Sequence, residues 1–124
     1  MYSKKQEEDL DCGIRIAFKI FGGKWKMCIL DAISRGIVRP ALIQKAIGIA
    51  PLRVIEMQLA ELLADGVLEK RIEEGIYPKK SMYFLTPFGE TILPVLTTID
   101  RWGTEHSGYV KSRMAPQPDM EIVT

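Results

Sequence analysis

The sequence has little of the chemistry on which most catalytic and metal sites depend. Its 124 residues hold one histidine, His106, and two cysteines, Cys12 and Cys28. No C-x-x-C pair occurs, and the histidine is far from both cysteines in sequence, so the spacing excludes the common zinc motifs. Two isolated thiols do not make a disulfide framework. We therefore expect no metal and no cofactor.

Long hydrophobic runs are also missing. No apolar stretch reaches the roughly 18 residues of a membrane span, and residues 1–9 lack the apolar segment of a secretion signal. We expect a cytoplasmic protein without membrane contact. Hydrophobic residues make up 47% of the chain, enough for a packed core, which excludes general disorder.

The sequence also lacks the pattern of an enzyme, which needs an acid/base constellation, a metal cluster or a phosphate loop. His106 has no evident partner, Gly22-Gly23 is not part of a phosphate-loop sequence, and the acidic residues are dispersed. We therefore predict that the protein is not an enzyme.

Charge is balanced overall but unevenly distributed. The formal net charge is only +1. Residues 12–55 contain eight basic residues and one acid, net +7, whereas residues 56–74 carry net −4. Such a division can present one positive face to phosphates, although ordinary solvated charges would give the same count.

Helical spacing of apolar residues predicts four helices in the first half of the chain, at about 12–21, 24–34, 40–47 and 51–64. Glycines separate the first three, and Pro51 suits the first turn of the fourth. Ile37 and Val38 suit a short strand. Cys28 falls on an apolar face of the second helix, where we expect it to be buried.

Two strands and a final helix are predicted in the second half. The strands, 67–74 and 81–86, flank a hairpin loop that carries Lys79 and Lys80. Thr86 and Pro87 are a cap and first residue for a long helix, which Pro94 should bend. Residues 1–11 are predicted as a flexible arm, 12–110 as the domain, and 111–124 as a tail.

This order of elements predicts a winged helix-turn-helix. The fold class is mainly α with a small β-hairpin wing (α+β), and the terminal helices serve dimerisation. The fourth helix is slim enough to enter the major groove of DNA with its N-terminus first. Opposite its buried stripe lie residues expected to face the bases: Arg53, Glu56, Met57 and Ala60.

Each DNA contact has an expected role. Arg53 can reach guanine or phosphate, and Glu56 can accept from a cytosine amino group. Phosphate contacts are expected from the preceding helix and from the wing tip; these residues are Arg39, Gln44, Lys45, Lys79 and Lys80. The two wing lysines would also suit a hairpin tip that merely discourages edge pairing.

Several segments match a known family. They are Cys12-Gly13, Ile20-Phe21-Gly22-Gly23-Lys24-Trp25-Lys26, Tyr83-Phe84-Leu85-Thr86-Pro87-Phe88-Gly89, Leu93-Pro94-Val95-Leu96 and Trp102-Gly103. Together they resemble HxlR-type regulators, a bacterial branch near the MarR-like winged-helix proteins. The resemblance implies a DNA-binding homodimer that represses or activates genes. The chain departs from the family at Pro40, Pro51 and Glu56, which lie on the DNA-reading surface.

A dimer would read two half-sites of a pseudo-palindromic operator. The terminal helices carry more apolar surface than a compact core needs. The alternative is that the last helix folds back on its own core, and the family resemblance favours the dimer. The expected dimer interface comprises Ile14, Phe18, Phe88, Ile92, Ile99 and Trp102.

Cys12 matches a cysteine that senses oxidants or electrophiles in some relatives, and Arg15 or the helix start would favour its thiolate. The effector itself, redox or small-molecule, is not identified by the sequence. An alternative function is a winged helix used only for protein contacts.

Overall fold

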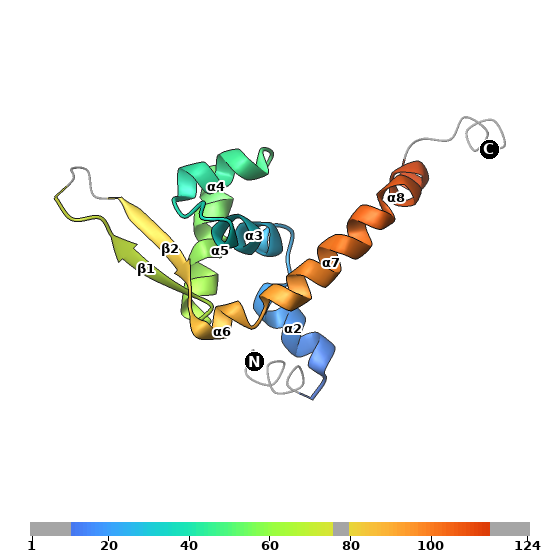
Figure 1. Ribbon diagram of the computed structural model, residues 1–124, viewed down its shortest axis with the longest axis horizontal. Coiled ribbons are helices and arrows are strands. Elements are labelled where there is room, and N and C mark those ends of the chain that lie inside the picture. The colour runs from blue at the N-terminus through green and yellow to red at the C-terminus, as the bar shows by residue number, and fades with distance from the viewer. Residues whose placement is uncertain (1–10, 76–79, 115–124) are drawn as a thin grey trace. The chain divides into compact units, whose positions relative to one another are not determined.

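The computed structural model describes residues 11–75 and 80–114. The chain divides into two compact units, residues 1–93 and 94–124, each of which is described by itself. The first unit contains α2 (Gly13–Phe21), α3 (Lys26–Ser34), α4 (Pro40–Ile47), α5 (Leu52–Ala64), β1 (Leu68–Ile72), β2 (Ser81–Leu85) and α6 (Pro87–Glu90) (Figure 1). Two further helices follow, α7 (Leu93–Glu105) and α8 (Ser107–Met114).

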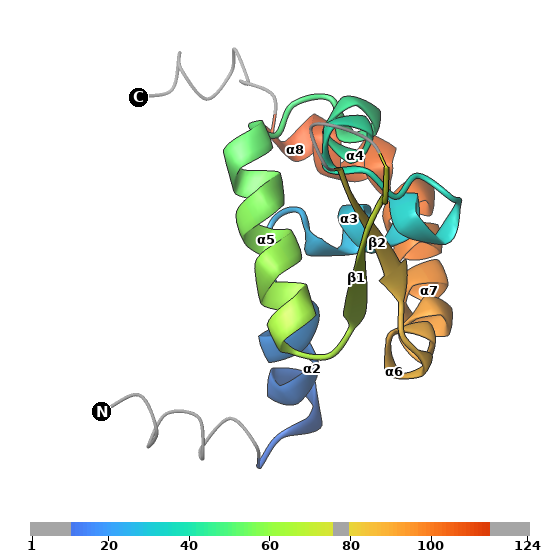
Figure 2. The same ribbon diagram turned by 90° about the vertical axis from the view of Figure 1, so that its left-hand side faces the viewer.

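The core of the first unit lies between three helices and a two-stranded sheet. α3 contacts α4, α5 and β2, and α5 lies lengthwise beside β1 (Figure 2). The fully buried side chains are aliphatic: Ile29, Leu30, Ile43, Ile55, Leu59, Leu62 and Val67. Their removal from water stabilises the arrangement of the helices, because each buried aliphatic side chain contributes about 1.5–3 kcal/mol.

A tight turn joins α4 to α5. Gly48 follows α4 with φ +97°, a left-handed conformation that favours glycine. Pro51 precedes α5 in extended backbone, and no side chain caps the helix. The turn is fixed from α4, since Gln44 Nε2 donates a hydrogen bond to the Ala50 carbonyl at 3.2 Å. This helix-turn-helix has the boundaries that the sequence predicted to within about a residue.

The wing is an antiparallel hairpin in which Leu68 pairs with Leu85 and Ile72 with Ser81. The predicted strand at Ile37 and Val38 is not formed, and that prediction was wrong. The segment bonds to the sheet edge through Val38, whose carbonyl accepts from Tyr83 N at 2.9 Å. The segment is too short for a ladder because Pro40 begins α4 directly after it.

The single long terminal helix predicted from the sequence is divided into α6, α7 and α8. Thr86 caps α6 as predicted, accepting from Gly89 N at 3.0 Å, and its hydroxyl lies 2.6 Å from the Gly66 carbonyl. Gly89 permits this packing: a Cβ there would lie 2.2 Å from the Val67 carbonyl oxygen.

One expectation about α3 is reversed. Cys28 is exposed and does not lie on the buried face of α3, where the sequence had predicted it. Lys26 lies on the inward face with Ile29, Leu30 and Ile33, is 8% exposed, and pairs through Nζ with Glu61 Oε1 of α5 at 2.9 Å. Because Cys28 stands two residues from Lys26, about 200° around the helix, it points outward.

Candidate nucleic-acid interface

The outward face of α5 is open. Arg53, Glu56, Met57 and Ala60 are all exposed, whereas Ile55 and Leu59 on the opposite side are fully buried. No other segment of the first unit covers this face among the residues described. The helix is therefore free to enter a groove with its N-terminal half, and no acidic residue lies in its first turn to oppose phosphates.

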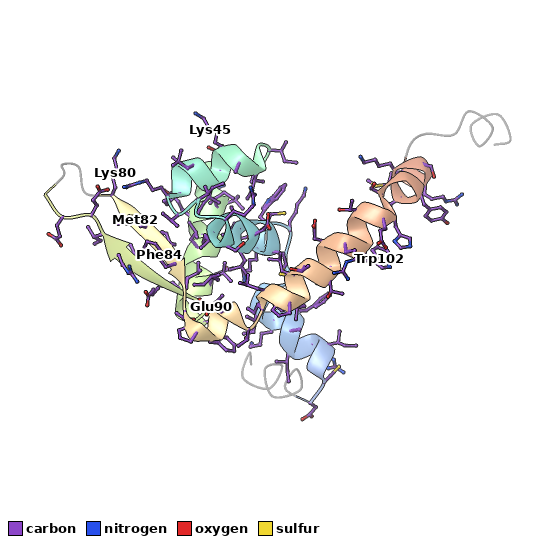
Figure 3. The ribbon with its side chains drawn as sticks, in the orientation of Figure 1. Lys45, Lys80, Met82, Phe84, Glu90 and Trp102 are labelled. Carbon is purple, nitrogen blue, oxygen red and sulfur yellow. The ribbon has the colours of Figure 1, made fainter. Side chains whose placement is uncertain are left out.

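Two lysines flank this helix from neighbouring elements. Lys45 is exposed on α4, and Lys80 is exposed directly before β2. Both side chains extend to the same side of the unit, the upper side in Figure 3. The start of α5 also lies at this end of the unit (Figure 2). Lys79, the other predicted wing contact, lies outside the described residues.

Arg39 has a partner within the chain. It precedes α4, and its Nη2 pairs with Glu73 Oε1, just beyond β1. Both side chains are about 30% exposed, and Arg39 Nη1 is buried without a hydrogen-bond partner. The pair links the start of α4 to the wing, where Glu73 N donates to Lys80 O at 2.8 Å. The geometry thus favours a positioning role over the predicted phosphate contact.

Gln44 is likewise engaged, because its side-chain amide holds the turn through Ala50 O. The Gln44 side chain is half-buried, and its hydrogen bond to the turn is enough to explain its position. Its predicted phosphate contact stays a prediction.

Internal pairing reduces the positive charge that the first half of the chain can present. Lys26 pairs with Glu61, Arg35 with Asp31 at 3.1 Å, and Arg39 with Glu73. The sequence count missed the first and third of these pairs because their partners are more than thirty residues apart. Lys45, Arg53 and Lys80 are among the cations that stay exposed.

Five of the six residues predicted at the dimer interface are exposed. Ile14 is 72% exposed and Phe18 64%, both on α2. Phe88 on α6 and Ile99 and Trp102 on α7 are also exposed large hydrophobic residues. Ile92 is the exception, at 6% exposure. Ile92 lies in the turn between α6 and α7 and packs inside its own chain, so it offers little surface to a partner, and its assignment to the interface stays a prediction.

Cys12 stands at the start of α2, half-buried. The pKa of its thiol is lowered by the backbone N–H groups of Arg15 and Ile14, with a smaller contribution from the Arg15 guanidinium, and burial opposes the shift. The thiolate is the nucleophilic form. The site therefore favours reaction at lower pH than an ordinary thiol.

The described residues hold neither a metal-binding cluster nor a membrane-spanning helix. No cluster of three or more His, Cys, Asp or Glu is placed to hold a metal ion there. No helix in that part of the chain has both the length and the apolar content to cross a membrane.

Comparison with known proteins identifies the family. The HxlR-like helix-turn-helix model matches residues 20–111. The chain is 33% identical over 99 residues to the uncharacterized HTH-type transcriptional regulator YdeP of Bacillus subtilis, covering 80% of this chain and 77% of that protein. It is 32% identical over 106 residues to regulator BH0655 of Halalkalibacterium halodurans, covering 85% of this chain and 93% of that protein.

Solved structures show the same fold. The redox regulator HypR in its reduced form superposes with a TM-score of 0.74 at 27% identity, covering 82% of this chain and 99% of that one. A putative MarR-family regulator from Porphyromonas gingivalis W83 gives a TM-score of 0.69 at 32% identity, covering 76% and 91%. Each of these relatives is named as a regulator. The chain has a winged helix-turn-helix fold with an open recognition helix, and the family model matches most of its length. The chain therefore belongs to the HxlR-like helix-turn-helix family and is a DNA-binding transcriptional regulator.

Proposed function

We propose that two copies of this chain bind one pseudo-palindromic operator, each placing α5 in the major groove. The observation that carries the proposal is the open outward face of α5, flanked by exposed Lys45 and Lys80. Arg53 contacts a guanine edge or a phosphate. Glu56 limits which base can occupy the position that it faces, because its carboxylate accepts from a cytosine amino group. Lys79 is proposed as a second wing contact. Because the partner is chromosomal DNA, we place the protein in the cytoplasm.

Salt dependence of duplex binding tests this interface. Phosphate contacts release counterions, so affinity should fall steeply with salt, and each contact removed should lower the slope of log K against log salt by about 0.9. Lys45→Ala and Lys80→Ala should each do so. Lys111→Ala, an exposed lysine of α8, is the matched control and should leave the slope unchanged. Arg53→Ala should cost about 1–3 kcal/mol if it reads a base.

The alternative is a winged helix used only for protein contacts. It predicts no measurable affinity for any duplex at low salt, including the DNA upstream of the chain's own gene. That result would refute the proposed interface.

We further propose that the exposed apolar residues of the terminal helices form the homodimer interface. Ile14, Phe18, Phe88, Ile99 and Trp102 expose large hydrophobic surfaces that a monomer would leave in water. Trp102→Lys should raise the dimer dissociation constant in sedimentation equilibrium and weaken operator binding. Lys111→Ala again serves as the control. A variant that stays dimeric at the same concentrations would remove Trp102 from the interface.

A second candidate function is regulation by oxidants through Cys12. The lowered pKa of its thiol favours the reactive thiolate. HypR, solved in reduced and oxidized forms, is 27–29% identical to this chain. Diamide should release the wild-type protein and a Cys28→Ser variant from DNA, and should fail to release Cys12→Ser. Equal release of all three proteins would refute sensing by Cys12.

A further inference from the structure

The outward face of α5 combines two kinds of side chain. Arg53 and Glu56 are charged, but Met57 is 49% exposed, and the small Ala60 is exposed as well. A solvated helix surface does not need large apolar groups at its centre. The exposure of Met57 and Ala60 on the face proposed to approach DNA favours a binding partner with an apolar group.

Helical geometry places these residues close together. Met57 follows Arg53 by four residues and precedes Ala60 by three, and residues at these spacings are neighbours on a helix surface. The core residues Ile55 and Leu59 are fully buried, so Met57, between them in sequence, points away from the core. Met57 and Ala60 therefore continue the surface that begins with Arg53.

The major groove offers one apolar group for such a surface. The edges of guanine, cytosine and adenine present hydrogen-bond donors and acceptors, whereas thymine adds a C5-methyl group. A methionine side chain is unbranched and polarisable, so it adapts to a methyl group without strict geometry. In the proposed interface Lys45 and Lys80 contact phosphates, which leaves Met57 and Ala60 for the floor of the groove.

We propose that Met57, supported by Ala60, selects thymine through its C5-methyl group. This inference rests on the proposed placement of α5 in the major groove. Four residues of helix advance about 6 Å, and base pairs are spaced about 3.4 Å apart. Each half-site thus carries a thymine within about two base pairs of the position contacted by Arg53.

Replacement of thymine by deoxyuridine tests this directly, because only the methyl group is removed. A preferred site is first selected from random duplexes, and each thymine is then replaced singly. Burial of one methyl-sized group contributes about 0.8 kcal/mol, so we expect about a fourfold loss of affinity at the thymine that Met57 contacts. Replacements outside the contact region should leave affinity unchanged.

A substitution at Met57 assigns the effect to this side chain. Glutamine has a similar length and helix propensity but is polar. In Met57→Gln the deoxyuridine penalty should disappear at the contacted position. Met114→Gln, which changes a 77% exposed methionine of α8, is the matched control and should retain the penalty.

The outcomes separate the two proposals. If the wild-type protein binds a selected duplex but tolerates deoxyuridine at every position, thymine selection is refuted and the proposed interface stands. If Met57→Gln keeps the full penalty, the methyl group is read by another residue and the inference is wrong. If no duplex is bound at low salt, the proposed interface fails and thymine selection fails with it.

Discussion

The ion pair between Arg39 and Glu73 can be tested by a double-mutant cycle of Arg39→Ala, Glu73→Ala and the double variant. Both side chains are about 30% exposed, so the pair is intermediate between exposed pairs, which contribute about 0.2–1 kcal/mol, and buried ones. We expect a coupling free energy of about 1 kcal/mol, the upper end of the exposed range. Urea unfolding followed by circular dichroism measures it.

Operator binding by the same variants separates two roles for Arg39. If the pair positions the wing against α4, both single variants should weaken binding by similar factors, and the salt slope should stay unchanged. If Arg39 contacts phosphate, Arg39→Ala should lower the slope by about 0.9. Glu73→Ala should then strengthen binding, because a negative charge is removed and the guanidinium released.

We expect the positioning result, since one amino group of Arg39 is bonded to the carboxylate and the other is buried. Tighter binding by Glu73→Ala, together with a coupling free energy near zero, would refute this reasoning. The proposed contacts of Lys45 and Arg53 would be unaffected by either outcome.

Three further predictions concern the packing and the thiol. Gly89→Ala should destabilise the protein by about 1–3 kcal/mol in urea unfolding, because the added Cβ meets a backbone carbonyl, whereas Gly103→Ala, in open space on α7, should stabilise it by roughly 0.5–1 kcal/mol; equal effects would contradict the packing. Lys26→Met should change the free energy of unfolding by less than about 1 kcal/mol, because it keeps an apolar stem and leaves a half-exposed carboxylate that water can solvate; a larger loss would mean that the charge itself is required. Alkylation of Cys12 by iodoacetamide should reach half its maximal rate at a lower pH than for an ordinary thiol, because a lowered pKa keeps the thiolate present as pH falls, and Arg15→Ala should move this midpoint upward; an unshifted midpoint would contradict the lowered pKa.

Local signals in the sequence predicted the helix-turn-helix well. Gly48 ends α4 and Pro51 precedes α5 because their backbone preferences act within a few residues. The capping role of Thr86 was predictable for the same reason. The exposed positions on α5 followed from helical periodicity alone, which assigned Arg53 and Met57 to the face opposite the core.

Long-range contacts were not predictable in this way. The burial of Lys26 depends on Glu61, a residue of another helix, and no local pattern announces that pair. The same holds for Arg39 and Glu73. The burial of Ile92 was not predicted, because one apolar stripe was extended across the break between α6 and α7 that only the tertiary structure reveals.

The start of α5 has a consequence for the balance between stability and DNA binding. Proline offers no side-chain oxygen, so the first amide groups of the recognition helix receive no cap from it. A serine in place of Pro51 would satisfy one of these donors and stabilise the free protein by about 0.5–2 kcal/mol. With proline at this position, the first backbone N–H groups of α5 remain available as donors. In the proposed complex a phosphate oxygen of the operator can accept from them.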